Sequence, residues 1–481
     1  MRLVFKFGGT SMAGSERITH AAGLALDAAK SHELVVVVSA MDGVTEQLLD
    51  LAATAGDGRG ELVQTLLKAL RVGHEATARE LGAAAPAQVG SLLDKLDTLA
   101  GGILAVGELT PRLADAVVAF GERLSSVMMG VAMRCPALDG QQAGIVTTDH
   151  FGEADPLMEL CIAGIDQNVR PLLAVGRPVV VAGFIAANQK GVTTTIGRGG
   201  SDYTATILGA ALKADEIHIW SDVDGLMTAD PRVVPSAKLL HTISFAEAIE
   251  LGKFGAKSMH PRALEPAAAY GVPVRMRSTF KPENPGTLIS GGAQVTRAGG
   301  SPASAVRAVP MLKNLAMITI GGAGMIGRPG TAAAAFDALA VARVNVHMIC
   351  QSVSEAGISI VVSQSQVKKA RGALERALLH HRPPGYGGVD SVPAISTGSQ
   401  ANADHIINSI EVQEDLVVIA VVGGGMRGTP GVAAKVFTAI AEKSVNIIAI
   451  AQGSSELSIA LAVQADQAKV AVSAIHEAFG I

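Results

Sequence analysis

The stretch that most constrains the fold is TTTIGRGGSDYTATILG at positions 193–209, which follows the apolar run PVVVAGFIA at 178–186 after a short polar connection. The apolar run predicts a buried strand that ends near Ala186. The glycines after it predict a tight turn that opens a helix, with Ser201 in the N-cap position. We therefore expect a strand, a glycine turn and a helix here, in that order.

The turn at residues 197–202 has the chemistry of an anion site. Glycines let the backbone approach a ligand closely, and the first turn of a helix offers unpaired N–H groups at the positive end of its dipole. Arg198 adds a planar fork for a carboxylate or phosphate, and Asp202 can orient a cation. The alternative is an ordinary glycine-rich turn with two surface charges.

The length of 481 residues exceeds what one hydrophobic core usually supports, so we expect two to four domains. Apolar residues make up 49% of the chain and aromatic residues only 3%, which favours helices packed on sheets over an aromatic-rich β architecture. The formal net charge is −4 with both signs interspersed, and it gives no reason to expect nucleic acid or a membrane as a partner.

The cysteines and the N-terminus bear on location. Three widely spaced cysteines fit a reducing compartment and show no metal-ligand spacing. The N-terminus, MRLVFKFGG, begins like a strand and lacks the apolar region of a signal peptide. No apolar run reaches the roughly 18 residues that a membrane helix needs. We therefore expect a soluble cytoplasmic protein.

Strands and helices alternate along the first part of the chain. Residues 3–7 predict a strand, 15–30 a helix and 34–38 a second buried strand. Residues 44–134 are mostly helical, and shorter pieces follow, such as the strand expected at 216–219 and the helix at 244–251. This alternation predicts an α/β domain with a mostly parallel sheet and helices on both faces.

Ligands of such sheets gather at the carboxyl ends of the strands. Several polar or glycine-rich segments follow directly after expected strand ends, namely KFGGTS, VSAMDGVT, GRGGSD and WSDVDG. These segments therefore hold the candidate site residues.

An internal repeat follows a composition shift at 291–304, which predicts a linker. Residues 317–362 align without gaps to 418–463, at an offset of 101 positions. Each copy predicts a strand, a Gly-rich turn, a helix, two strands and a helix. Two copies are too few for a solenoid, so we expect two small modules that pair, separated by a polar span at 380–404.

Each copy also matches the dinucleotide fingerprint GxGxxG, first at Gly322, Gly324 and Gly327. A dinucleotide site needs an acidic residue about 20 positions further on to hold a ribose hydroxyl. Those positions hold His347 and Ile448. The sequence therefore disfavours a nicotinamide site.

Several motifs together resemble aspartate kinase, an enzyme of the amino-acid-kinase superfamily: KFGGTS, GERLSS (121–126), TTIGRGGSDYTA, IWSDVDG (219–225), ADPR (229–232) and FGAKSMHP (254–261). The resemblance covers nearly the whole chain, since the repeats look like the ACT domains of that family. It implies an amino-acid-kinase fold, a mostly parallel sheet between helices, followed by two βαββαβ ACT modules. Because no dehydrogenase follows residue 481, the chain looks like the monofunctional form.

The resemblance also implies domain boundaries. The catalytic domain would span residues 1–293, and a linker would span 294–312. The ACT modules would span 313–390 and 391–481, with a strand near 304–309 that could join the second module.

The implied reaction is ATP-dependent phosphorylation of L-aspartate on its β-carboxylate, the first step toward lysine, threonine and methionine. That carboxylate has an ordinary pKa of about 3.9, so it needs no general base, and catalysis reduces to alignment and charge neutralisation. We expect Lys6 to lie across the transferring phosphoryl group, with the amides of Gly8 and Gly9 donating to its oxygens and Asp202 orienting Lys6. The alternative for Lys6 is an outward residue of an alternating strand.

Around the aspartate, the resemblance implies that Arg198 holds the α-carboxylate and Glu122 the ammonium. Thr45, Phe184 and Ser201 match family positions around the amino acid. The alternative for Glu122 is a solvated charge on a helix.

On the nucleotide side, the positions that match the family's ATP residues, besides Lys6, are Ser39, Ser221, Asp222, Met227, Arg232 and Lys257. Many relatives carry tyrosine where this chain has Met227, so we expect soft apolar contact rather than stacking on the adenine. Mg²⁺ would bridge phosphate oxygens and keep its waters, so we assign it no protein ligand. His260 is expected to be structural or capping rather than a metal ligand.

The Gly-rich turns of the repeats suit the α-carboxylate of an effector amino acid. The resemblance implies that the polar contacts are Asn345, Gln351, Asn446 and Gln452; the alternative is that these side chains merely tie off loops. The motif IAQGSSE looks most like threonine-responsive relatives, and VNVH at 344–347 replaces VNID of others, so threonine is favoured over lysine. ACT modules that pair across subunits would give a homodimer or homotetramer.

Two alternatives remain open. Another amino-acid kinase, acting on acetylglutamate or glutamate, is disfavoured by the tandem repeat and by GERLSS. A catalytically silent amino-acid sensor is disfavoured by the intact set of Lys6, Arg198 and Asp202.

Overall fold

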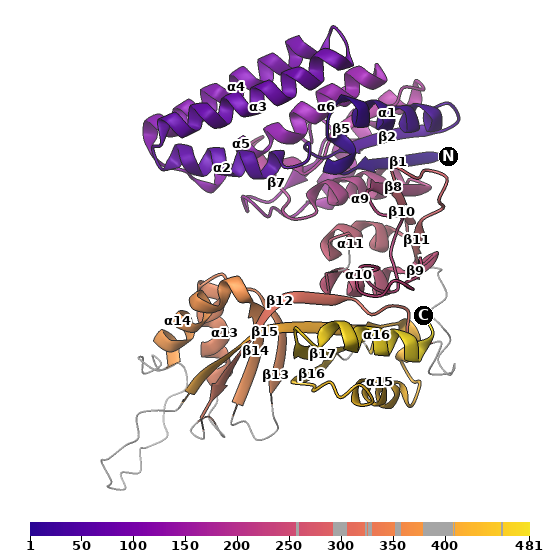
Figure 1. Cartoon of the computed structure of the whole chain (residues 1–481). Helices are drawn as coiled ribbons and strands as arrows, with labels where there is room; N and C mark the ends of the chain where they lie inside the picture. Colours follow the sequence, from indigo (N-terminus) through magenta and orange to yellow (C-terminus); the bar gives the residue numbers. More distant parts are fainter. Residues whose placement is uncertain are drawn as a thin grey trace, which may run out of the picture. The chain divides into compact units, whose positions relative to one another are not determined.

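The structure is a computed structural model that describes residues 1–255, 259–291, 305–322, 325, 330–351, 357–378, 407, 409–453 and 456–481. The chain divides into two compact units, and most of their helices and strands are labelled in Figure 1. The first unit contains Met1–Met227, Leu239–Lys253 and Lys257–Val295, and the second contains Thr228–Lys238, Phe254–Ala256 and Thr296–Ile481. Each unit has a hydrophobic core of its own.

The centre of the first unit is a sheet with eight strands in the described part of the chain, in the order β3-β5-β2-β1-β8-β10-β11-β9. All neighbours run parallel except β10 and β11. The strands are β1 (Arg2–Phe7), β2 (Glu33–Val38), β3 (Ala137–Leu138), β5 (Val179–Ala182), β8 (Glu216–Ser221), β9 (Thr242–Ser244), β10 (Val274–Ser278) and β11 (Thr287–Ser290). This confirms the predicted mostly parallel sheet.

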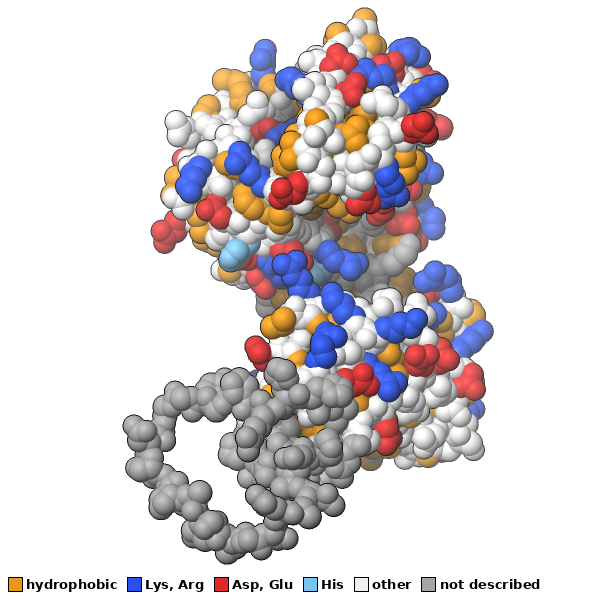
Figure 2. Space-filling view, turned by 90° about the vertical axis from the view of Figure 1, so that its left-hand side faces the viewer, with side chains coloured by type: hydrophobic (Ala, Val, Ile, Leu, Met, Phe, Trp, Pro, Cys, Tyr) orange, Lys and Arg blue, Asp and Glu red, His pale blue; other side chains and the backbone are white. Residues whose placement is uncertain are grey.

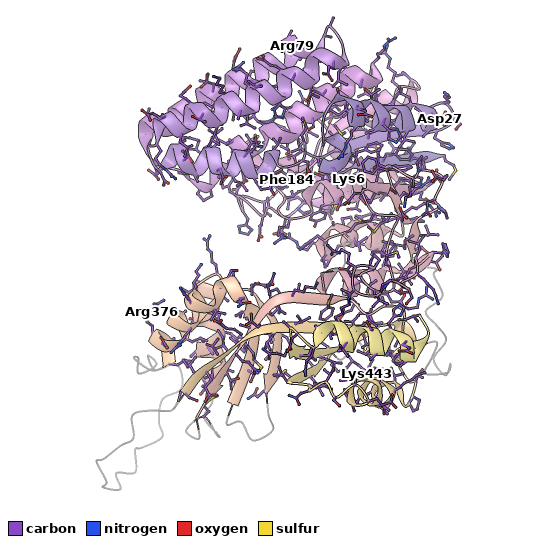
Figure 3. All side chains as sticks on the ribbon, viewed as in Figure 1. Lys6, Asp27, Arg79, Phe184, Arg376 and Lys443 are labelled. Atoms are coloured by element: carbon purple, nitrogen blue, oxygen red, sulfur yellow. The ribbon has the colours of Figure 1, made fainter. Side chains whose placement is uncertain are left out.

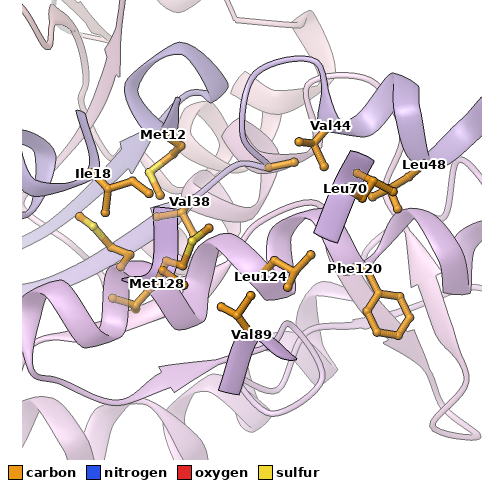
Figure 4. Close-up of a cluster of buried hydrophobic side chains, with 14 of the residues drawn as sticks. Met12, Ile18, Val38, Val44, Leu48, Leu70, Val89, Phe120, Leu124 and Met128 are labelled. Carbon is orange, nitrogen blue, oxygen red and sulfur yellow. The ribbon is translucent and has the colours of Figure 1, made fainter. Parts of the chain in front are cut away.

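Helices cover both faces of this sheet. Phe5, Phe7, Val36 and Val38 share a core with α1 and α6, while α9 packs against β1, β2 and β8. Figure 4 shows part of that core. The helices are η1 (Gly9–Met12), α1 (Ser15–Ala29), α2 (Val44–Gly56), α3 (Gly60–Leu81), α4 (Ala85–Val106), α5 (Pro111–Val118), α6 (Phe120–Met133), α7 (Met158–Asn168), α8 (Arg170–Ala174), α9 (Gly200–Leu212), α10 (Phe245–Lys253) and α11 (Pro261–Tyr270).

The strand predicted to end near Ala186 is two strands. β5 ends at Ala182, and β6 (Ile185–Asn188) belongs to a separate sheet with β4 (Val146–Thr147) and β7 (Thr193–Thr195). The break lies at Phe184, whose φ of 64° is left-handed and cannot continue a strand. The prediction of one strand was wrong because an unbroken apolar run hides such a turn.

One helical run in the described residues, Pro111–Met133, is long and apolar enough to cross a membrane by length and composition. It contains Asp115, Glu122 and Arg123, which is why the sequence shows no uninterrupted apolar run there. Of its most apolar window, 72% is buried inside the fold, as in the core helix of a soluble protein. The run is therefore weak evidence for a span.

His74 in α3 predicts a pH dependence of stability. It is 2% exposed; its Nδ1–H donates to the Leu70 carbonyl at 2.7 Å, and Nε2 has no partner among the described residues. Burial lowers its pKa, so below about pH 6.5 the unfolded chain binds the extra proton more readily than the folded chain. Stability should fall as the pH drops below that value, by at most about 1.4 kcal/mol per pH unit for this residue.

The measurement is the free energy of unfolding in urea at pH 7.5, 6.0 and 5.0 for the wild type and His74→Leu. We expect the loss of stability between the highest and lowest pH to be smaller in the variant. Equal losses in both proteins would show that His74 does not titrate in this way.

The second unit contains a sheet with six strands in its described residues, in the order β13-β14-β12-β15-β17-β16. The strands are β12 (Met311–Gly321), β13 (Val346–Gln351), β14 (Gly357–Ser363), β15 (Ser409–Val422), β16 (Ala449–Gln452) and β17 (Ser458–Gln464). The helices are α13 (Thr331–Val341), η3 (Gln364–Gln366), α14 (Val367–Leu378), η4 (Gly424–Met426), α15 (Val432–Ala441) and α16 (Ala468–Phe479). The element order of each copy is the one that the repeat predicts.

The two repeats are joined through their long central strands. The first part of β15 pairs with β12, from Ser409 opposite Gly321 to Gln413 opposite Met317, and supplies the last strand of the first module. In return, the chain before β12 pairs with the second module, where Ala308 bridges Val422. The predicted boundary at 390/391 and most of the predicted linker lie outside the described residues. Each module therefore has the βαββαβ pattern only because the chain exchanges a strand between them.

Candidate active site

One cavity of about 620 Å³ in the first unit collects many of the predicted site residues. It lies where the carboxyl ends of β1 and β2 meet the amino end of α9. The predicted residues that line it are Lys6, Gly9, Ser39, Thr45, Glu122, Phe184, Arg198, Ser201 and Asp202. Lys6 and Phe184 are labelled in Figure 3.

Lys6 stands one residue before the end of β1, between Val37 of β2 and Ile219 of β8. Because side chains alternate along a strand, Lys6 points to the face that α9 covers, opposite to Phe5 and Phe7. Its Nζ lies 2.6 Å from Oδ1 of Asp202. With 9% exposure, Lys6 is buried, so the alternative of an outward strand residue is wrong.

The two glycines after β1 lie near Lys6 and the cavity, and the space beside Gly8 would admit a side-chain carbon in ordinary contact with the Lys6 amine. A Cβ on Gly8 would lie 3.6 Å from Lys6 Nζ. The N–H of Gly8 donates to the carbonyl of Trp220 at 3.2 Å, so in this structure it is committed to the fold and does not point free for a phosphoryl oxygen as predicted. Gly9 is the first residue of η1 and lines the cavity, and first-turn amides have no partner within their own helix.

The turn before α9 depends on two glycines. Gly197 and Gly199 have φ values of 77° and 70°, and a Cβ on Gly199 would lie 2.6 Å from the Cβ of His260. Gly199, not Ser201, is the N-cap of α9. The prediction failed because Ser is the commoner N-cap, whereas only Gly fits the left-handed conformation against His260. Ser201 is 8% exposed and lines the cavity instead.

Arg198 is exposed at the rim of the cavity. Within the described part of the chain its guanidinium forms no ion pair, so its five N–H donors are available to a ligand.

Phe184 is held in its left-handed conformation by the start of α9. Its N–H donates to Thr204 Oγ1 at 2.9 Å, and a Cβ on Gly200 would lie 2.5 Å from its ring. A bulky residue with positive φ is strained, and such residues cluster at ligand sites. The ring thus forms one wall of the cavity beside Ser201.

Glu122 is a buried acid in the first turn of α6, with 4% exposure. Burial raises its pKa to about 8, although the Ala40 and Glu122 backbone and the nearby Lys6 oppose this shift. Oε2 has no hydrogen-bond partner among the described residues. The alternative of a solvated helix charge is therefore wrong, and a cationic group from the cavity would favour the ionised form of this carboxyl.

The predicted nucleotide residues are only partly brought together. Ser39 lines the cavity, while Ser221 and Asp222 stand at the carboxyl end of β8, the strand next to β1. Met227 does not line the cavity and bridges Leu239. Two further predictions fall elsewhere: Lys257 lies outside the described residues, and Arg232 belongs to the second unit, where it is exposed and pairs with Asp230 at 2.8 Å.

The comparisons with known proteins agree with this architecture. The Amino acid kinase family matches residues 1–278, and the ACT domain matches 318–378 and 419–479. An aspartokinase of Mycolicibacterium smegmatis is 31% identical over 486 residues, which cover 100% of this chain and 96% of that protein. The chain belongs to the aspartokinase family. The resemblance seen in the motifs is thereby confirmed.

Other relatives of this aspartokinase-family chain are longer. Bifunctional aspartokinase/homoserine dehydrogenase 1 of Arabidopsis thaliana is 33% identical over 487 residues, covering 99% of this chain and 51% of that protein. The chain thus spans about half the length of the bifunctional relatives it matches. The solved structure of E. coli aspartokinase III in complex with aspartate and ADP matches with a TM-score of 0.77, 28% identity and 100% coverage of both chains.

Sequence reasoning missed Asp115, which also lines the cavity. It is 4% exposed, although it belongs to the helical run ADAVV, whose other residues are apolar. A lone carboxylate on the buried face of an apolar helix is the signal that would have found it, because buried charges need dedicated partners.

The four predicted effector contacts occupy equivalent places in the two ACT modules. Gln351 and Gln452 end β13 and β16, and the N–H groups of Asn345 and Asn446 donate to the side chains of glutamines 21 positions further on, at 3.3 Å in both modules. Parts of the Gly-rich turn of the first module lie outside the described residues. The effector role of these residues stays a prediction.

Proposed function

We propose that the chain transfers the γ-phosphoryl group of ATP to the β-carboxylate of L-aspartate, giving β-aspartyl phosphate and ADP. The observation that carries this proposal is that the Lys6–Asp202 pair and the Arg198 turn line one cavity. The complex of the E. coli relative with aspartate and ADP supports both substrates. The product would feed amino-acid biosynthesis in the cytoplasm, toward lysine, threonine and methionine.

The proposed step needs no general base. The β-carboxylate oxygen attacks the γ-phosphorus, the bond from phosphorus to the bridging oxygen breaks, and ADP leaves with that electron pair. Lys6 balances the charge on the transferring group, and Asp202 holds the Lys6 amine in place. Arg198 grips the α-carboxylate as a fork, and Glu122 accepts the ammonium. Together these contacts align the nucleophile with the phosphorus.

Mg²⁺ is expected to accompany ATP. No cluster of three or more His, Cys, Asp or Glu side chains suited to a metal occurs in the parts of the chain that the structure describes. Since Mg²⁺ favours phosphate oxygens and water, we propose that it arrives on the nucleotide, where it would neutralise phosphate charge.

The direct test is an aspartate hydroxamate assay with ATP. Hydroxylamine traps the acyl phosphate, so aspartate-dependent hydroxamate formation supports the kinase. Glutamate and acetylglutamate in place of aspartate test the other amino-acid kinases. If aspartate binds but no hydroxamate and no ADP form with any of the three, the chain is an amino-acid sensor.

Replacing Arg198 with Lys should raise the KM for aspartate about 10- to 100-fold, since a lysine keeps the charge but loses the bidentate fork. The KM for ATP should change little. Steady-state kinetics with each substrate varied in turn would measure both constants, and Arg134→Lys, outside the cavity, is the matched control. An unchanged KM for aspartate in Arg198→Lys would contradict the clamp.

We further propose feedback control by an amino acid at the ACT modules, with threonine favoured over lysine. A coupling of about 1 to 3 kcal/mol would inhibit roughly 5- to 150-fold. A complex of the E. coli relative with lysine and aspartate supports an amino-acid effector in general. Calorimetry with threonine and with lysine separates the two.

The same modules suggest a homodimer or homotetramer. β13 and β16 end the second unit's sheet, and their equivalent residues Ile349 and Ile450 are 51% and 48% exposed. These two strands also lie against each other, since Cys350 Sγ donates to the carbonyl of Ile450 at 3.5 Å, so the two exposed isoleucines belong to one apolar surface that favours contact with another copy. Light scattering of the purified chain would give its mass in solution.

A further inference from the structure

The buried carboxylate of Asp115 is placed to hold the walls of the cavity together. It lies in α5 and is 4% exposed. Its Oδ2 accepts from the N–H of Gly152 at 3.0 Å and from the N–H of Thr195 at 2.9 Å, while Oδ1 accepts from Thr195 Oγ1 at 2.8 Å. One side chain thus ties three segments that are far apart in sequence.

The two segments that Asp115 ties are themselves joined. The N–H of Ala154 donates to the carbonyl of Thr195 at 2.9 Å. A Cβ on Gly197 would lie 3.2 Å from Cγ of Glu153 and 3.5 Å from the carbonyl oxygen of Gly152, so the loop at 152–153 lies directly against the turn. Both Gly152 and Glu153 line the cavity.

Thr195 is the last residue of β7 and stands three positions before Arg198. It is 2% exposed, whereas Arg198 is exposed and has no ion pair among the described residues. The position of the guanidinium therefore depends on where the backbone of the turn is anchored. Two neighbouring residues anchor the backbone before Arg198: the N–H of Ile196 donates to the carbonyl of Phe184 at 3.1 Å, and Thr195 donates to Asp115 from both its N–H and its hydroxyl.

We propose that Asp115 is a positioning residue for the amino-acid substrate: it fixes the Arg198 turn and the 152–153 loop against each other. The inference rests on the proposed function, in which Arg198 holds the α-carboxylate. Asp115 acts through the segments that it holds, because its two oxygens already accept three hydrogen bonds, two from backbone N–H groups and one from the Thr195 hydroxyl. Its loss should weaken aspartate binding while leaving the ATP side, at the ends of β1 and β8, unchanged.

Two pairs of variants, one at Asp115 and one at Thr195, separate the effect of losing the hydrogen bonds from the effects of changing the charge and the size of the side chain. In Asp115→Asn the amide oxygen can accept from both backbone N–H groups and the NH₂ can donate to Thr195 Oγ1, so the bonds survive without the charge. Asp115→Ala removes all three bonds. Thr195→Ser keeps the hydroxyl that Asp115 accepts from, and Thr195→Val removes it. Glu247→Ala is the matched control, since Glu247 lies in α10 of the same unit, is 2% exposed and accepts a hydrogen bond from the hydroxyl of Ser244 at the end of β9.

The kinetic readout is the KM for each substrate. Asp115→Ala should raise the KM for aspartate about tenfold or more, and Thr195→Val by a smaller factor, because small displacements of a binding group cost this much. In Asp115→Ala and Thr195→Val, the KM for ATP should stay within about twofold of the wild-type value. The three control variants should keep a KM for aspartate near the wild-type value; they are Asp115→Asn, Thr195→Ser and Glu247→Ala. A parallel rise of both KM values, or no rise in either Ala or Val variant, would overturn the proposal.

Amide hydrogen exchange supplies a readout that does not need turnover. In Asp115→Ala and Thr195→Val the amides of residues 150–154 and 195–199 should exchange faster, with little change elsewhere in the first unit. If Asp115→Ala does not fold, Thr195→Val decides by the same two measurements. An inactive wild type would count against the proposed function alone, whereas exchange that is unchanged in these segments counts against the role of Asp115.

Discussion

Lys6→Ala is expected to lower kcat for aspartate phosphorylation by about 10² to 10³, the usual loss when one preorganised charge partner of a transition state is removed. Lys6 lies 2.6 Å from Asp202 and is buried at the end of β1. Among the described residues that line the cavity there is no second lysine that could replace it. The KM for aspartate should change far less than kcat, because Lys6 acts on the phosphoryl group. Steady-state kinetics by the hydroxamate assay measures both.

This prediction needs controls for stability, since Lys6→Ala leaves the charge of Asp202 without its partner. The double variant Lys6→Ala/Asp202→Asn removes that charge and should regain stability without regaining turnover. Lys30→Ala is the surface control, because Lys30 pairs with Asp27 in the open and 76% of its side chain is exposed. A folded Lys6→Ala enzyme with near wild-type kcat would overturn the assignment.

Glu122→Gln is expected to raise the KM for aspartate about 10- to 100-fold, the cost of losing a charged hydrogen bond in a buried site. The pH dependence is the sharper signature. Burial raises the pKa of Glu122 to about 8, so the carboxyl is mostly protonated at pH 7 and must ionise to accept the ammonium. The kcat/KM for aspartate should therefore rise about tenfold per pH unit below pH 8 and level off above it.

The Gln variant cannot ionise, so its kcat/KM should lose this slope. Calorimetry of aspartate binding at pH 7 in buffers of different ionisation enthalpy should show nearly one proton released by the wild type and none by Glu122→Gln. The control is Glu247→Gln, another buried carboxyl that lies outside the cavity. A wild-type profile that is flat between pH 6 and 8 would contradict the role of Glu122.

Much of the fold could be predicted because the signals are local. The alternating and apolar strands at 3–7 and 34–38, the helix from Ser15 and the repeat at an offset of 101 follow from periodicity, and all appear in the structure. The failures also have local causes. The run at 178–186 predicts one strand, whereas the chain turns at Phe184, because hydrophobicity does not report a left-handed residue. Local preference predicts Ser201 as the N-cap, but the N-cap is Gly199, whose close contact with His260 joins residues about 60 positions apart and cannot be seen in the local sequence.

In the cavity, too, some features could be predicted from local sequence and others could not. The residue types needed for phosphoryl transfer, Lys6, Arg198 and Asp202, could be picked out because each stands in a distinctive glycine-rich motif. The orphaned oxygen of Glu122 and the three bonds of Asp115 could not, since burial and hydrogen bonding depend on segments brought together by folding.

On the surface, Lys and Arg side chains are interspersed with Asp and Glu over the face shown in Figure 2, as the charge pattern of the sequence indicates. The exchange of strands between the two modules, in contrast, could not be predicted from the sequence. It is decided by which backbone edges meet: β15 pairs with β12 from Ser409 to Ile419, and its second part, from Leu416 on, also pairs with β17.

The sequence by itself determined the kind of elements, their order, the repeat and the chemical groups at the strand ends, because these follow from periodicity and from the chemistry of single residues. Only the tertiary structure decided that Lys6 meets Asp202, that Glu122 is buried with a raised pKa, and that Asp115 anchors the Arg198 turn. The reason is physical: pairing, desolvation and backbone anchoring are properties of contacts between distant segments, and no single stretch of chain contains them.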